Sequence, residues 1–319
     1  MAGEGKWVTG ISPETPAEEA AKRVLAARLG TVKHYLPLAG TQAHEDVEYV
    51  HQLRVATRRT GAALRIFKPY LARKPLRHAK EALRAVRQAA GSARDWDVFA
   101  EYLAGSKAFK GAGTEASLDF LTGYALGERA AAQVTLTATA AALQPEIDEA
   151  CEALPGSAGP AKEEETPPTF GDLAVSHLTA LFDGFAASIA ASPTTPDQLH
   201  QLRILGKRVR YAMEVFAECF APPFGEVLYP AVERVQEVLG TVQDGNVGLT
   251  RIAGIRARVK ATRPDIAKRV QKGLLAVERE LRLSVRTHTR AFQEWIGEWT
   301  KLTAAHPLPE LLHVAGAAA

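Results

Sequence analysis

The segment HQLRVATRRTGAALRIF at residues 51–67 decides the fold, because a related segment, HQLRILGKRVRYAMEVF, follows at residues 200–216. The offset from residue 51 to residue 200 is 149 residues, and it holds without a gap over about fifty residues. The same offset pairs Gly91 with Gly240, Asp95 with Asp244 and Val98 with Val247. One offset held over this length indicates an internal duplication. The chain is therefore expected to have two structurally equivalent halves.

The first of these segments has the periodicity of an amphipathic helix. At 100° per residue, one face carries Leu53, Ala56, Thr60, Leu64 and Phe67, and the opposite face carries His51, Arg54, Arg58 and Arg65. The second segment repeats the pattern. Its apolar face is Leu202, Leu205, Val209, Met213 and Phe216, and its polar face is His200, Arg203, Lys207 and Arg210. Each copy is expected to pack by the apolar stripe and to present a cationic stripe away from that core.

The rest of the chain predicts an all-α fold. It has 319 residues, is rich in helix-forming Ala, Leu and Arg, and shows no alternating strand pattern. Eight helices are expected, four in each half. The simplest architecture is two four-helix bundles related by a pseudo-two-fold axis. The repeats are residues 1–154 and 170–319, joined by a Pro-, Gly- and Glu-rich linker at 155–169 that contains the Glu163–Glu165 run.

Glycines and prolines set the expected helix ends. The first helix is expected to stop at Tyr35, before Pro37, and the third at Ala90, with Gly91 as its C-cap. A glycine-rich interruption is expected at residues 240–248 in the seventh helix. Asp95 and Asp244 then either cap a new helical segment or pair with arginines and fix their rotamers.

The charge distribution indicates a polyanion as the ligand. The formal net charge is only +3, yet between His51 and Arg87 the single acid is Glu81. Unpaired cationic stripes repel themselves unless a polyanion neutralises them. Two further helices add cations at spacings of three and four, namely Arg77, Lys80, Arg84 and Arg87 on the third, and Lys268, Lys272, Arg279, Arg282, Arg286 and Arg290 on the eighth. If the second and sixth helices come together, their stripes would line one shared basic channel.

Other features favour a soluble cytoplasmic protein without cofactors. Two separated cysteines, Cys151 and Cys219, give neither a disulfide framework nor a zinc pattern. Neither His51 nor His200 belongs to a metal-binding motif, so phosphate contact or orientation of arginines is the expected role. The N-terminus lacks the pattern of a signal peptide, and no apolar run is expected to span a bilayer. We therefore expect no metal and no membrane contact.

The segments 51–67 and 93–98 (ARDWDV) resemble the signature of CHAD domains, the conserved-histidine α-helical domains. The second copy departs from it, with Gln243 in place of Arg94 and Asn246 in place of Asp97. The resemblance implies two helical bundles, a basic central surface, and binding of inorganic polyphosphate in the cytoplasm or at polyphosphate granules. No triphosphate-tunnel strand pattern is present, which indicates a stand-alone member of the family.

Carried onto this sequence, the resemblance implies a polyphosphate-binding set of His51, Arg54, Arg58, Arg59, His200, Arg203, Lys207 and Arg208. Helical geometry adds Arg65, Lys80, Arg84, Arg87, Arg210, Arg279, Arg282 and Arg286. No catalytic residue is expected. Nucleic-acid binding is the first alternative, disfavoured because aromatic residues are not interleaved with the basic stripes. A phosphate-transfer enzyme is the second, disfavoured because no phosphate-binding loop of the type GxxxxGK[ST] and no carboxylate cluster for magnesium are found.

Overall fold

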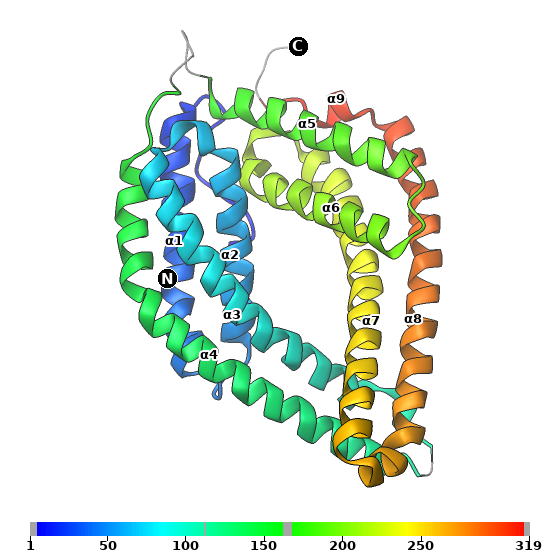
Figure 1. Ribbon diagram of the computed structural model, residues 1–319. Coiled ribbons are helices and arrows are strands. Elements are labelled where there is room, and N and C mark those ends of the chain that lie inside the picture. Colours follow the sequence, from blue (N-terminus) through cyan, green and yellow to red (C-terminus); the bar gives the residue numbers. More distant parts are fainter. Residues whose placement is uncertain (1–4, 112, 162–167, 316–319) are drawn as a thin grey trace.

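The computed structural model describes residues 5–111, 113–161 and 168–315, and in this part of the chain the fold is all-α, as predicted (Figure 1). The described residues contain no strand, only the isolated bridges Pro16–Thr169 and Phe220–Val314. The first half contains α1 (Ala17–Thr41), α2 (Glu48–Ile66), η1 (Lys68–Tyr70), α3 (Arg73–Gly105), η2 (Lys107–Phe109) and α4 (Glu115–Gly156). The second half contains α5 (Phe170–Ala190), α6 (Pro196–Phe216), η3 (Ala217–Cys219), η4 (Phe224–Leu228), α7 (Tyr229–Thr262), α8 (Pro264–Ala305) and α9 (Leu308–Leu311).

The apolar stripes of the two repeated helices lie in the core, as their periodicity predicts. In α2, Leu53, Thr60 and Phe67 are fully buried, and the hydroxyl of Thr60 donates to the carbonyl oxygens of Arg28 and Ala56. In α6, Leu202, Val209, Met213 and Phe216 are fully buried, and Leu205 is half-buried. Burial of these faces fixes the direction in which each polar stripe points.

Both hydrophobic cores combine the two halves of the chain. The larger core runs from Val8 to Leu312 and takes residues from all of the helices α1–α8. The smaller one joins the far ends of α3, α4, α7 and α8, which meet at the base of the molecule in Figure 1. There α4 and α8 approach so closely that a Cβ added to Gly273 would lie 2.2 Å from Ser117 Cβ. The two repeats are therefore joined at both ends rather than standing as separate bundles.

The two halves share helix order but differ in how their outer helices pack. In the first half α1 meets α4 through small residues, and a Cβ added to Gly40 would lie 2.8 Å from Ala140 Cβ. In the second half α5 meets α8 through large rings, because Phe182 and Phe185 contact Trp299. The pseudo-two-fold relation between the halves stays a prediction.

Gly91 does not end a helix, so the expected break in the third helix is wrong. Helix α3 continues to Gly105, because the surrounding alanines favour helix and Ala89, Ala90 and Ala93 are buried in the core. A Cβ on Gly91 would lie 4.0 Å from Arg54 Nε, an ordinary van der Waals distance, so Gly91 faces Arg54 but packing does not require a glycine there. Asp95, one turn further on, therefore caps no new segment.

The other expected interruptions are also absent from the described residues. Helix α7 is continuous over residues 240–248, where Gly245 and Gly248 allow α8 to approach; a Cβ on Gly245 would lie 2.6 Å from Val285 Cγ2. Helix α1 continues past Tyr35 and contains Pro37, with Thr41 donating to the Pro37 carbonyl. The Glu163–Glu165 run of the expected linker lies outside the described residues.

Helix α5 corrects the expectation that no segment could span a membrane. By length and composition alone it is long and apolar enough, with a mean hydropathy of 1.4. Its buried apolar residues, however, lie on one face at spacings of three and four, namely Phe170, Ala174, Leu178, Phe182, Phe185 and Ile189. Asp172 and Asp183 lie on the exposed side. This is the pattern of an amphipathic core helix.

Candidate functional site

The polar stripes of α2 and α6 come together, as the sequence analysis expected if those helices pack against each other. The two helices contact each other, and their side chains line two neighbouring pockets, which we name the two lobes of the α2–α6 groove. Both lobes are bordered by Arg54, Arg58, Asp95 and Arg203. The groove is therefore built from both repeats, with its centre at the α2–α6 contact.

The cationic lobe of the groove has a volume of about 480 Å³. Its charged lining consists of seven cations, Arg54, Arg58, Arg65, Arg87, Arg203, Lys207 and Arg208, and one acid, Asp95. Gln88, Ser92 and Tyr211 add polar groups that the sequence patterns had not indicated. An excess of this size makes the lobe strongly attractive to polyanions.

The mixed lobe has a volume of about 450 Å³ and a different lining. Its apolar and aromatic lining residues are Val98, Phe99, Tyr102, Val247 and Leu281, from α3, α7 and α8. The polar side chains are Thr241, Gln243 and Ser284, together with His200, Asp244 and Arg251. Sequence reasoning missed Arg251, whose guanidinium carbon lies 4.1 Å from the centre of the Trp96 ring and whose Nη1 donates to the Asp95 carbonyl.

The repeated aspartates position arginines at the centre of the groove. Asp95 Oδ1 accepts an ion-pair contact from Arg54 Nη2 at 2.9 Å, which confirms the pairing role that the sequence had left as one of two possibilities. Asp244 lines the mixed lobe with Arg203, the equivalent arginine of the second half. The Asp95 carboxylate restricts the rotamers of Arg54 while leaving other donors of its guanidinium available to a ligand.

Among the basic residues of the cationic lobe, Lys207 has the pKa that is shifted most from its ordinary value. Desolvation by burial is the main cause that lowers the pKa of Lys207 to about 7, followed by the nearby charges of Arg58, Arg203 and Arg54, while Asp244 acts in the opposite direction. Burial also lowers the pKa of Arg54 and of Arg203, and Arg58 adds to both effects. The empty groove thus holds cations whose mutual repulsion a bound polyanion would relieve.

The two repeated histidines have different surroundings. Burial lowers the pKa of His51, with Arg94, Arg54 and Arg58 contributing in the same direction and Glu48 opposing. His200 instead lies with Nδ1 at 3.0 Å from Oε1 of Gln243. Gln243 stands at the position that Arg94 occupies in the first half, so the second copy replaces a repelling cation by a hydrogen-bonding amide. No group of three or more His, Cys, Asp and Glu among the described residues is placed to hold a metal ion.

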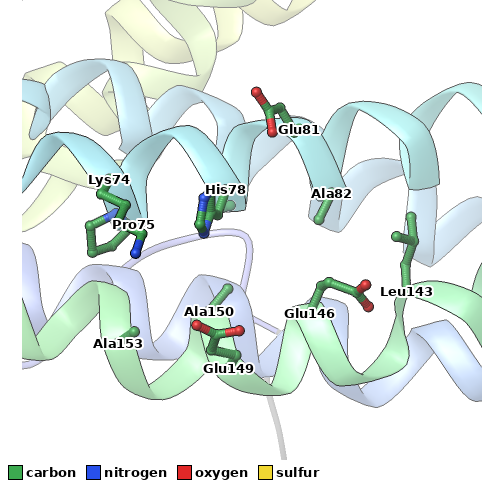
Figure 2. Close-up of a pocket in the computed structure, with 11 residues that line it drawn as sticks. Lys74, Pro75, His78, Glu81, Ala82, Leu143, Glu146, Glu149, Ala150 and Ala153 are labelled. Carbon is green, nitrogen blue, oxygen red and sulfur yellow. The ribbon is translucent and has the colours of Figure 1, made fainter.

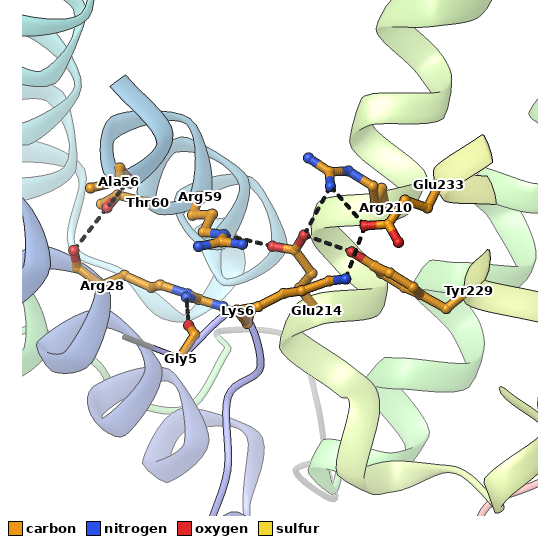
Figure 3. Close-up of polar contacts among 10 residues, drawn as sticks. All are labelled: Gly5, Lys6, Arg28, Ala56, Arg59, Thr60, Arg210, Glu214, Tyr229 and Glu233. Atoms are coloured by element: carbon orange, nitrogen blue, oxygen red, sulfur yellow. Dashed lines mark hydrogen bonds and ion pairs between the residues drawn. The ribbon is translucent and has the colours of Figure 1, made fainter. Parts of the chain in front are cut away.

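The structure separates Arg59 and Arg210 from the groove. Both contact Glu214, a fully buried carboxylate on α6 (Figure 3). Arg59 Nε lies 2.7 Å from Glu214 Oε2, and the Tyr229 hydroxyl donates to Oε1 at 3.0 Å. Adjacent helix positions differ by about 100°, which is why Arg58 points into the groove while Arg59 points into this network.

The network around Glu214 also holds the N-terminal segment in place. Arg28 of α1 donates to the carbonyl oxygens of Gly5 and Lys6, and Lys6 Nζ lies 2.9 Å from Glu233 Oε1 (Figure 3). The backbone amide of Val8 donates to the Glu214 carbonyl. These contacts connect α1, α2, α6 and α7, so the network fixes how the two repeats meet on the side of α2 away from the groove.

We predict that Glu214→Ala lowers the free energy of unfolding by about 3–5 kcal/mol, because it leaves Arg59 and Arg210 without their buried counterion. Equilibrium unfolding in urea, followed by circular dichroism at 222 nm, measures this loss. Glu298→Ala is the matched control, since Glu298 pairs with Arg234 on the surface with about half of each side chain exposed. The control is expected to lose less than about 1 kcal/mol. Equal losses for the two variants would contradict the assigned role of Glu214.

The remaining cations of α3 and α8 lie outside the lining of the two lobes. Desolvation lowers the pKa of Lys80, and the charges of Lys68 and then of Arg65 act in the same direction; Lys80 is exposed and lines neither lobe. Arg84 is exposed on α3. On α8, Arg279, Arg282 and Arg286 are exposed, and Arg282 is paired with Glu278 one turn earlier. Arg279, Arg282 and Arg286 therefore do not line either lobe of the groove.

A larger pocket, of about 600 Å³, lies between α3 and α4 (Figure 2). Glu146 and Glu149 project from α4, and Glu81, Lys74 and His78 come from α3 (Figure 2). Its charge is therefore mainly negative, the wrong sign for a polyanion. Charge rather than size makes the α2–α6 groove the candidate functional site.

Comparison with known proteins agrees with the fold and with the repeated motifs. The family model described as CHAD domain matches residues 12–253. The crystal structure of the CHAD domain from the plant Ricinus communis is similar over 93% of this chain and 96% of that chain, with a TM-score of 0.67 and 19% identity. PptA from Streptomyces chartreusis is similar over 88% of this chain and 99% of that chain, with a TM-score of 0.68 and 19% identity. The search of curated proteins gave no match. Motifs, fold and family model agree that this chain belongs to the CHAD domain family.

Proposed function

We propose that this protein binds inorganic polyphosphate in the α2–α6 groove. The observation that carries the proposal is the charge of the cationic lobe, which is lined by seven cations from both repeats and by a single acid. A polyphosphate chain carries closely spaced negative charges along a flexible backbone, so it can contact several of these side chains at once. The resemblance to CHAD domains implies the same ligand.

The individual side chains suit phosphate oxygens. Arginine presents a planar fork of donors that makes bidentate contacts to phosphate, and lysine adds a mobile point charge. No carboxylate of the described residues forms an ion pair with Arg58, Lys207 or Arg208, whereas Asp95 holds Arg54 in position. The proposed set is Arg54, Arg58, Arg65, Arg87, Arg203, Lys207 and Arg208, with Lys80, His51 and His200 at its borders.

We further propose that the protein is a binding module in the cytoplasm or at polyphosphate granules and not an enzyme. The groove combines an array of cations with two carboxylates, Asp95 and Asp244, that face arginines. That arrangement suits retention of an anion more than activation of water, which needs a free base or a bound metal.

The proposal predicts tight and salt-dependent binding of polyphosphate. Long-chain polyphosphate and a duplex DNA with the same number of phosphates are titrated at 50 and 200 mM salt, and phosphate release is measured in parallel. Polyphosphate is expected to bind at least about tenfold more tightly than DNA, because a single flexible chain can enter the groove. Affinity for polyphosphate is expected to fall with salt through release of counterions. Tighter binding of DNA would overturn the ligand assignment, and release of phosphate would overturn the non-enzymatic role.

A further inference from the structure

The mixed lobe of the groove differs from the cationic lobe in a way that polyphosphate alone does not explain. A bare phosphate chain gains nothing from the apolar side chains that line this lobe, Val98, Phe99, Val247 and Leu281. Its volume of about 450 Å³ lies within the range of small-molecule sites, which combine apolar walls with a few polar groups. The lobe thus has the properties of a pocket for an organic group.

The polar groups of the mixed lobe are suited to the edges of a planar heterocycle. Gln243 offers an amide, and Thr241 and Ser284 offer hydroxyls. Arg251 adds a flat guanidinium held by its contacts with Trp96 and Phe99 and by its hydrogen bond to the Asp95 carbonyl. Aromatic rings and arginine planes are the surfaces on which nucleobases stack in proteins.

The arginines that line both lobes would determine the orientation of such a ligand. Arg54, Arg58 and Arg203 border both lobes, so a phosphate group at the junction meets cations from both repeats. Phosphates beyond it would follow Lys207, Arg208, Arg65 and Arg87 into the cationic lobe. An organic group on the other side of the junction phosphate would lie in the mixed lobe.

We propose that the groove binds nucleoside oligophosphates, with the nucleoside in the mixed lobe and the phosphate chain in the cationic lobe. This inference rests on the proposed function, because the same cations hold the phosphates in both cases. It adds a preference for phosphate chains that carry a nucleoside at one end.

Three ligands with three phosphates each separate the contributions: inorganic tripolyphosphate, ribose 5-triphosphate and ATP. Affinities are measured by isothermal titration calorimetry at 150 mM salt with a chelator present, so that divalent cations do not alter the ligand charge. ATP is expected to bind at least about fivefold more tightly than either ligand without a base, as base stacking in proteins would give. Equal affinities for all three ligands would overturn the nucleoside inference and leave polyphosphate binding intact. Failure of all three to bind, together with failure of long-chain polyphosphate, would instead overturn the proposed function.

Val247→Trp tests the location of the nucleoside. Val247 lines the mixed lobe but not the cationic lobe and is 40% exposed, so an indole at this position fills the pocket without entering the core. ATP affinity is expected to fall to that of tripolyphosphate, while tripolyphosphate affinity stays the same. Val134→Trp on α4 is the matched control, because Val134 is 71% exposed and lines neither lobe. Unchanged ATP affinity in Val247→Trp, or equal loss of both ligands, would contradict the assignment of this lobe to the nucleoside.

Discussion

Reversal of two charges, Arg58→Glu together with Lys207→Glu, is expected to weaken polyphosphate binding about 100-fold or more while the helical fold is kept. The two side chains come from different repeats and line the same cationic lobe. Hydrogen bonds to charged groups contribute about 1.5–3 kcal/mol each, and the introduced carboxylates add repulsion. Neither residue has a carboxylate partner within the described residues, so reversal breaks no ion pair. Calorimetric titration measures the affinity, and circular dichroism measures the helicity.

The matched control is Arg279→Glu together with Arg286→Glu on α8. It makes the same change in net charge on exposed residues that do not line the groove. We expect its effect on affinity to be less than about fivefold at 150 mM salt, where charges beyond about 8 Å are screened. A similar loss for both double variants would show that the ligand follows the surface of α8, which the sequence analysis had included in the binding set.

Polyphosphate binding is expected to weaken as the pH rises from 7 to 9, and Lys207 is the reason. Its pKa in the empty groove is about 7, since burial and then the charges of Arg58, Arg203 and Arg54 disfavour the ammonium form. A bound polyanion favours the ammonium form and raises that pKa, so binding takes up a proton. The affinity is therefore highest below pH 7 and falls by up to about tenfold per pH unit above it, until the pKa of the bound state is reached. Titrations with long-chain polyphosphate at several pH values measure this slope.

Lys207→Arg is the control for this pH dependence. Arginine keeps its charge throughout this range, so the variant is expected to bind with nearly the same affinity at pH 7 and pH 9. Calorimetry in two buffers of different ionisation enthalpy gives an independent count of the protons taken up on binding. This proton uptake should disappear in Lys207→Arg. If Lys207→Arg kept the slope of the unaltered protein, another group would be responsible for the proton uptake.

The helical periodicity at residues 51–67 and 200–216 was sufficient to predict the fold class and the faces that are buried. Leu53 and Leu202 lie in the core for the reason that their spacing indicated, because an apolar stripe of a helix must be covered. The glycine signals were misleading, since propensity is a weak determinant when a helix is packed along its length. Gly91 and Gly245 lie inside long helices, where the first faces Arg54 and the second allows α8 to approach.

The candidate site was predicted in part. The repeat predicted that His51, Arg54, Arg203 and Lys207 belong together, and the contact between α2 and α6 places Arg54, Arg203 and Lys207 around one lobe. Arg251 and the apolar lining residues Val247 and Leu281 carried no recognisable signal, because they reach the groove from α7 and α8, outside the repeated segments. The isolated acid Glu214, one turn after Arg210 in an otherwise basic stripe, was a signal that could have been used.

The sequence by itself determined that this protein is helical and carries cationic stripes, because these properties depend on residues close together in the chain; the duplication of its structure stays a prediction. Only the tertiary structure decided which cations line the same groove. Arg58 and Arg59 are neighbours in sequence, yet one lines the groove and the other pairs with buried Glu214. Their separation depends on helices from both halves of the chain, and local periodicity contains no information about which partner covers each side of α2.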